Sequence, residues 1–133
     1  MKTTLKQLVF AASTLFAIVI IFSSFMSRNS IANGTGIADG KSFSLNAVKQ
    51  KDGVVSGQIQ YGADDYTVNG GEWFGSAAIL YTTDGHAFYV RDNKGPQTDW
   101  ISDPIPASPG QLLSPVDFYF MHFANIGNIQ VKE

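Results

Sequence analysis

The chain contains no cysteine among its 133 residues. This absence excludes disulfide bonds, thiolate metal sites, cysteine nucleophiles and the acylated cysteine that anchors a lipoprotein. Charge is also sparse, at 15% of residues, and there are only two histidines. Residues 33–133 carry six basic and eleven acidic side chains, a net charge of −5. They therefore lack the basic stripe that nucleic acids and anionic membrane surfaces attract, and no nucleic-acid partner is expected.

The first 32 residues have a composition of their own. Two lysines open the chain, an apolar run covers 8–26, and the small residues of Ser30-Ile31-Ala32 follow. This order is typical of a secretory signal peptide, with cleavage expected before Asn33. The alternative is an uncleaved hydrophobic helix that anchors the protein, because the run approaches the length of about 20 residues that spans a bilayer. In both cases the rest of the chain is exported, as a secreted or periplasmic domain or one anchored to the membrane.

Export without cysteine points to a bacterial source, since small extracellular domains of animals depend on disulfides. Residues 33–133 are enough for one domain with a hydrophobic core and too few for two. Glycine-rich residues 33–39 are expected to form a flexible lead-in to a single domain at 40–133.

Helical periodicity is missing after residue 32, whereas apolar and polar residues alternate in many places, as in half-buried strands. The predicted strands are 41–49, 54–61, 66–69, 76–82, 86–91, 100–102, 116–124 and 126–131. Gly70-Gly71 suggests a bulge or corner, and four prolines make 103–115 the longest loop. Residues 116–124 are apolar on both faces, which predicts a central strand. The expected fold is therefore all-β, a small antiparallel sandwich or barrel of seven or eight strands preceded by a hydrophobic helix.

Three segments, 43–61, 87–101 and 127–131, carry a family resemblance. The first contains Asp52-Gly53-Val54 followed by Ser56-Gly57 and Gln60-Tyr61, the second contains Val90-Arg91-Asp92-Asn93-Lys94-Gly95, and the third is Gly127-Asn128-Ile129-Gln130-Val131. Their order and spacing resemble post-COAP-type β-domains of secreted bacterial proteins, over about half of the exported chain. The resemblance implies an extracytoplasmic β-domain of unassigned activity, and it implies no catalytic residues.

The loop 92–99 is the candidate metal site. Asp92, Asn93 and Asp99 offer carboxylate and amide oxygens, which Ca²⁺ prefers. The alternative is that Asp92 and Asn93 cap a turn through hydrogen bonds to the backbone. A structural role is also favoured for His86 and His122, because no spacing supplies further ligands beside either histidine.

Core packing accounts for most aromatic residues, and Trp73 and Trp100 are the candidates for ligand binding. Trp73 lies in a glycine-rich segment, where an indole ring can stack on a sugar or a peptide. No catalytic residue is assigned. We expect a non-enzymatic binding or accessory module of the cell envelope, with a glycan or protein ligand. The alternative is a small metal-dependent hydrolase that uses loop 92–99, which requires that loop and the two histidines to converge.

Overall fold

A computed structural model describes residues 29–95 and 97–133, which form an all-β domain with ten strands and one short 3₁₀ helix, η1. The strands are β1 (Ser30–Ala38), β2 (Lys41–Lys49), β3 (Val55–Tyr61), β4 (Asp64–Phe74), β5 (Ala77–Thr82), β6 (His86–Arg91), β7 (Asp99–Ser102), β8 (Ile105–Pro106), β9 (Phe123–Ile126) and β10 (Asn128–Lys132). Helix η1 spans Pro115–Phe118. Every strand pair is antiparallel.

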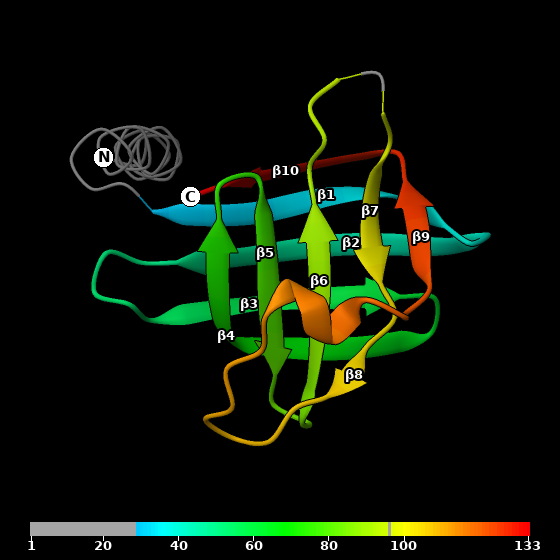
Figure 1. The fold of residues 1–133 in the computed structure, drawn as a ribbon. Coiled ribbons are helices and arrows are strands. Elements are labelled where there is room, and N and C mark those ends of the chain that lie inside the picture. The colour runs from blue at the N-terminus through cyan, green and yellow to red at the C-terminus, as the bar shows by residue number, and fades with distance from the viewer. Residues whose placement is uncertain (1–28, 96) are drawn as a thin grey trace, which may run out of the picture.

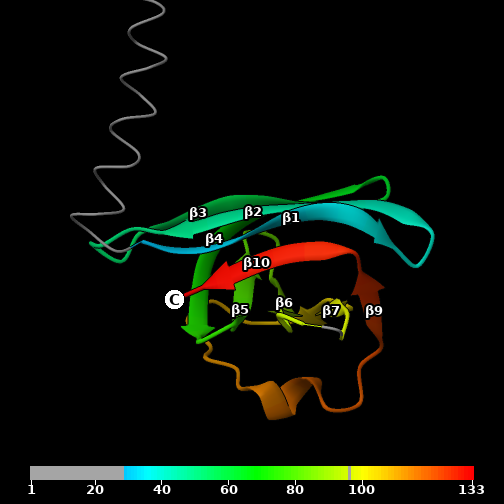
Figure 2. The same ribbon diagram turned by 90° about the horizontal axis from the view of Figure 1, so that it is seen from above.

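The strands form one sheet in the order β10-β1-β2-β3-β4-β5-β6-β7-β9, with β8 paired to β6. The sheet coils into two layers, in which β5, β6, β7 and β9 cross the direction of β1, β2 and β3 (Figures 1 and 2). Strand β4 belongs to both layers because its register shifts between Val68 and Gly70. The irregularity therefore lies at Asn69, immediately before the expected Gly70-Gly71, and β4 does not stop there but continues through both glycines to Phe74.

Close contacts of β1 with β9 and β10 nearly close the sheet into a barrel. Strand β10 pairs with β1 over five residues, and β9 leads into β10 through Gly127. A Cβ atom at Gly34 would lie only 2.6 Å from the Cα of Ile129, and one at Gly36 would lie 3.3 Å from Cγ2 of Ile126. Glycine at both positions therefore permits the close approach of these strands.

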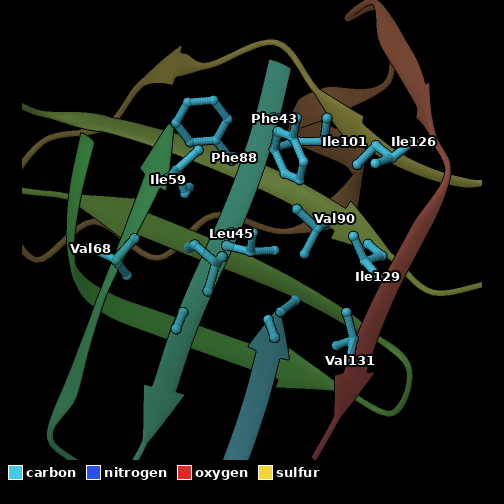
Figure 3. Close-up of a cluster of buried hydrophobic side chains, with 14 of the residues drawn as sticks. Phe43, Leu45, Ile59, Val68, Phe88, Val90, Ile101, Ile126, Ile129 and Val131 are labelled. Atoms are coloured by element: carbon cyan, nitrogen blue, oxygen red, sulfur yellow. The ribbon is translucent and has the colours of Figure 1, made fainter. Parts of the chain in front are cut away.

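Alternating side chains of both layers fill the barrel interior (Figure 3). The labelled core residues are Phe43, Leu45, Ile59, Val68, Phe88, Val90, Ile101, Ile126, Ile129 and Val131. They come from β2, β3, β4, β6, β7, β9 and β10. The core thus joins strands from every part of the chain, so the terminal strands are integral to it.

A second, smaller core lies on the outer side of β5 and β6, under residues 103–122, which we name the strap. The two ends of the strap lie side by side, because the Asp103 amide donates to the carbonyl of His122 at 2.9 Å. It covers Ile79 and Ala87 with Leu113 and Phe118, all of them buried. Figure 2 shows η1 lying outside the β5–β6 layer. The predicted proline-rich loop is therefore a packed layer of the domain.

Several expectations need correction. Residues 33–39, expected to be a flexible lead-in, lie almost entirely in β1, where backbone pairing to β2 and β10 outweighs the glycine content. Residues 116–124 are not a central strand: they form η1, a turn and the start of β9. A helical turn forms here because Ser114 caps it, Pro115 occupies its first position, and the Asp117 side chain accepts from the Ser114 amide. The strand count is ten, not seven or eight.

The predictions for the N-terminal segment concern mostly residues 1–28, which lie outside the described part of the chain. This includes the hydrophobic helix and most of the signal peptide or anchor at 1–32. Residues 29–95 and 97–133 contain no helix long and apolar enough to cross a membrane. The expected cleavage point before Asn33 lies within β1.

Candidate functional site

A cleft of about 410 Å³ opens between the bend of β4, the β5–β6 turn and the strap. Its lining includes Asn69, Gly70, Gly71 and Glu72 from β4, Tyr81, Thr82, Thr83, Gly85 and His86 from the hairpin, and residues 107–112 from the strap. The two glycines lack side chains at the bend, so backbone groups and the Tyr81 ring border the space. A small concave site with one aromatic ring and several polar groups suits a small polar ligand.

Tyr81 connects the strap to the floor of the cleft. Its hydroxyl accepts a hydrogen bond from the Leu113 amide at 2.8 Å and donates to Oε2 of Glu72 at 3.4 Å. Burial raises the pKa of the phenol, the Leu113 hydrogen bond lowers it, and the negative charge of Glu72 raises it further. Tyr81 is therefore a neutral group at physiological pH that fixes the position of a carboxylate.

Two polar residues that line the cleft, Thr82 and His86, are held in place by Asp84 in the β5–β6 turn. Asp84 accepts hydrogen bonds from the Thr82 hydroxyl and from Nδ1 of His86, which lies 3.1 Å away. The Thr82 hydrogen bond, followed by that of His86, lowers the pKa of Asp84. The Thr82 hydroxyl also accepts from the His86 amide at 3.1 Å. These bonds orient His86 and explain its structural place in the hairpin.

The candidate metal residues Asp92 and Asp99 lie at the barrel seam, the gap between β10 and the ends of β6 and β7. Both are only 8% exposed. Oδ2 of Asp99 accepts from the Ile129 amide at 2.9 Å, and Oδ2 of Asp92 accepts from the Val131 amide at 3.2 Å. Each second oxygen accepts from the loop backbone, at Asn93 for Asp99 and at Lys94 for Asp92. The two carboxylates therefore accept the hydrogen bonds that a neighbouring strand would otherwise accept from the free edge of β10.

This hydrogen bonding bears directly on the suggested Ca²⁺ site. Each of the four carboxylate oxygens accepts from one amide N–H group, so hydrogen bonds to the backbone explain the positions of both side chains without a bound cation. The side-chain oxygen of Asn93 accepts from Nε of Arg91 at 3.1 Å. In the described part of the chain no three histidine, aspartate or glutamate side chains gather as a metal site. The geometry favours the alternative for Asp92, in which its side chain caps a turn: Oδ1 of Asp92 accepts from the Lys94 amide at 3.0 Å.

The two tryptophans do not line the cleft. Trp73 is 7% exposed and donates from Nε1 to the carbonyl of Ile31 at 2.9 Å, which ties β4 to β1. Trp100 is half-buried, with its ring centroid 4.5 Å from Phe123 and 5.0 Å from Tyr89. Both contacts are edge-on and belong to the packing beside the strap. The structure thus gives Trp73 and Trp100 packing contacts.

The residues required by the hydrolase alternative lie at three separate places. Asp92 and Asp99 are at the seam, and His86 is at the β5–β6 turn beside Asp84. His122 lies at the end of the strap, where Nε2 is 2.6 Å from Oδ2 of Asp39 in the β1–β2 turn. The convergence that this alternative required is absent among the described residues.

Sequence reasoning missed the cleft itself, including Glu72 and Tyr81. The bend at Gly70-Gly71 was a usable signal, because it places β4 beside the β5–β6 turn. The strap wall had no such signal, since nothing in residues 107–112 indicates where the loop folds back. No protein-family description, curated protein or solved structure matches the chain.

Proposed function

We propose that this protein is an exported, non-enzymatic binding module of the cell envelope. The observation that carries the proposal is the cleft beside the strap, which joins the Tyr81 ring to neutral amide and hydroxyl groups. Export rests on the N-terminal sequence pattern. The resemblance to post-COAP-type domains, which rests on the three segments that carry it, supports export but indicates no activity.

The cleft chemistry favours a neutral glycan as the ligand. Asn69, Thr83, Ser108 and Gln111 present amide and hydroxyl groups, which pair with sugar hydroxyls, and Tyr81 offers an apolar ring. Glu72 adds one acceptor held by the Tyr81 hydroxyl. A protein ligand remains the competing class, and binding measurements separate the two.

The test is an NMR titration of the protein with a neutral N-acetylglucosamine oligosaccharide. We expect chemical-shift changes at Gly70, Gly71 and residues 107–112, and their loss in a Thr83→Trp variant that fills the cleft. The matched control is Gln58→Trp, an exposed position on β3, which should bind like the parent. Shift changes that map elsewhere, or that persist in Thr83→Trp, would refute the cleft as the binding site.

A further inference from the structure

The strap exposes a compact set of large apolar side chains. We name them the tip residues: Leu112, Val116, Tyr119 and Phe120, which are 78%, 70%, 72% and 93% exposed. All four lie within nine consecutive positions. The other large exposed apolar residues of the described chain are Ile37, Val54 and Phe74, which lie on β1, in the β2–β3 turn and at the end of β4. Only the strap gathers such residues, and this concentration marks a contact surface.

The exposure of the tip residues is built into the strap. Leu113 and Phe118 alternate with them in sequence and are buried against β5 and β6. Backbone hydrogen bonds run from Asp117 to Ser114, from Tyr119 to Val116 and from Met121 to Phe118. The rings of Tyr119 and Phe120 pack edge-on with centroids 4.9 Å apart. The tip is therefore preorganised, which lowers the entropic cost of binding.

The charges around the tip indicate the chemistry of its partner. The strap contains no lysine or arginine, and its two acids are Asp103 and Asp117. The Asp117 carboxylate accepts from the Ser114 amide at 2.7 Å. An anionic surface would be repelled by these acids and by the net charge of −5 on residues 33–133. The partner surface must therefore offer an apolar layer and carry no net negative charge.

The chain before β1 indicates what that partner is. The apolar run 8–26 ends four positions before β1 begins at Ser30. In the alternative in which the run is uncleaved and lies in a bilayer, the domain is held at the membrane surface and the tip meets lipid at high effective concentration. Tyrosine and phenylalanine are residues that favour the bilayer interface. Of the tip residues, only Leu112 lines the cleft, and the other three are at least 70% exposed, so they project outward from the strap.

From these observations we infer that the strap tip inserts into the interfacial region of a neutral lipid bilayer. Leu112, Val116, Tyr119 and Phe120 enter the lipid, while Asp117 stays at the level of the headgroups. This contact shares only Leu112 with the cleft. With the N-terminal run uncleaved, it gives the domain a second attachment, which orients the cleft relative to the membrane.

The absence of cysteine makes the test direct, because a single introduced cysteine is labelled alone. The full chain with Val116→Cys, carrying an environment-sensitive fluorophore, is reconstituted with phosphatidylcholine vesicles. We expect blue-shifted emission and quenching by brominated lipids. The same label at Val54→Cys, an exposed position in the β2–β3 turn, should report water. Replacing a third of the lipid with an anionic one should weaken the signal at 116.

Substitutions identify the tip as the cause. Leu112→Ser with Phe120→Ser, in the Val116→Cys background, should lower the ratio of inserted to water-facing label about tenfold or more. Phe74→Ser, an exposed apolar residue on β4, is the matched control and should leave it unchanged. A label at 116 that reports water on attached protein overturns the inference. So does a blue shift that grows with protein concentration without lipid, since that outcome assigns the tip to self-association.

Discussion

At the scale of single residues, two buried aspartates replace a strand. Strand β10 pairs with β1 on one side only, and no other described strand pairs with its second side. The amides of Ile129 and Val131 point to that second side. Asp99 and Asp92 accept from these amides. Buried donors without acceptors cost free energy, so each carboxylate contributes to closing the barrel.

Asp99→Asn is expected to lower the free energy of unfolding by about 1–3 kcal/mol, because one of its two N–H contacts becomes a donor facing a donor. Equilibrium urea unfolding measures the change. Asp65→Asn, at an exposed position of β4, is the control and should stay within about 0.5 kcal/mol of the parent. Equal stabilities of the two variants would show that the seam does not depend on the charge of Asp99.

The His122–Asp39 pair predicts a pH dependence. The hydrogen bond and charge of Asp39, aided by the charge of Asp103, hold the pKa of His122 above its ordinary value of 6.5. A group with a raised folded-state pKa contributes stability that is fully present below pH 6.5 and disappears as the pH rises through the folded-state value. His122→Gln should therefore destabilise the protein at pH 5.5 and have little effect at pH 9. Thermal melts across this range provide the measurement, and Asp39→Asn should abolish the same pH dependence.

At the scale of elements, the sequence predicted best where side chains alternate between turns of clear chemistry. Strands β2, β3, β5 and β6 lie within two residues of their expected bounds, because Gly53 and Gly85 adopt the positive φ that ends each hairpin strand. The predictions for segments 33–39 and 116–124 were wrong for opposite reasons. Pairing on both edges makes a strand of glycine-rich β1, whereas Pro115 and the Ser114 cap begin a helical turn in an apolar run.

The candidate site was less predictable than the strands. The composition of loop 92–99 points to Asp92 and Asp99. Their role as hydrogen-bond acceptors, however, depends on β10 residues that lie 39 and 30 positions away in the chain. The cleft depends in the same way on the strap returning to β4 and β5. Such long-range contacts leave no local pattern, so only the folded arrangement reveals them.

The start of β1 yields a prediction about processing. Cleavage before Asn33 would remove Ile31, whose carbonyl accepts from Trp73, and Ala32, which is fully buried. A fragment beginning at Asn33 should be less stable than one beginning at Asn29 by about 2–4 kcal/mol, since a buried indole N–H loses its acceptor and core contact is lost. Urea unfolding of the two fragments gives the difference. Fragments of equal stability would restore Asn33 as a tolerable mature N-terminus.

At the scale of the whole molecule, β10 holds together parts of the chain that are far apart. It pairs with β1, contributes Ile129 and Val131 to the core, and supplies the amides that satisfy Asp92 and Asp99. The inward alternation of Phe43, Leu45 and Ala47, and of Ile129 and Val131, predicts that strand 41–49 and the last strand pair or lie adjacent. This prediction is wrong for 41–49, because β1 lies between β2 and β10. Adjacency therefore holds for β1, which sequence patterns had assigned to a lead-in.

A chain ending at Ile126 tests this closing role of β10. The truncation removes two buried aliphatic side chains, at about 1.5–3 kcal/mol each, and leaves two buried carboxylates without their β10 donors. Domains of this size have only about 5–15 kcal/mol of stability, so the truncated chain should be largely unfolded or aggregate through the bare edge of β1. Circular dichroism melts and sedimentation measure both outcomes. The control deletes only Glu133, whose side chain accepts from the Gly75 amide at an exposed site, and should change the melting temperature only slightly. A soluble 1–126 chain with an unchanged melting temperature would show that β10 does not close the barrel.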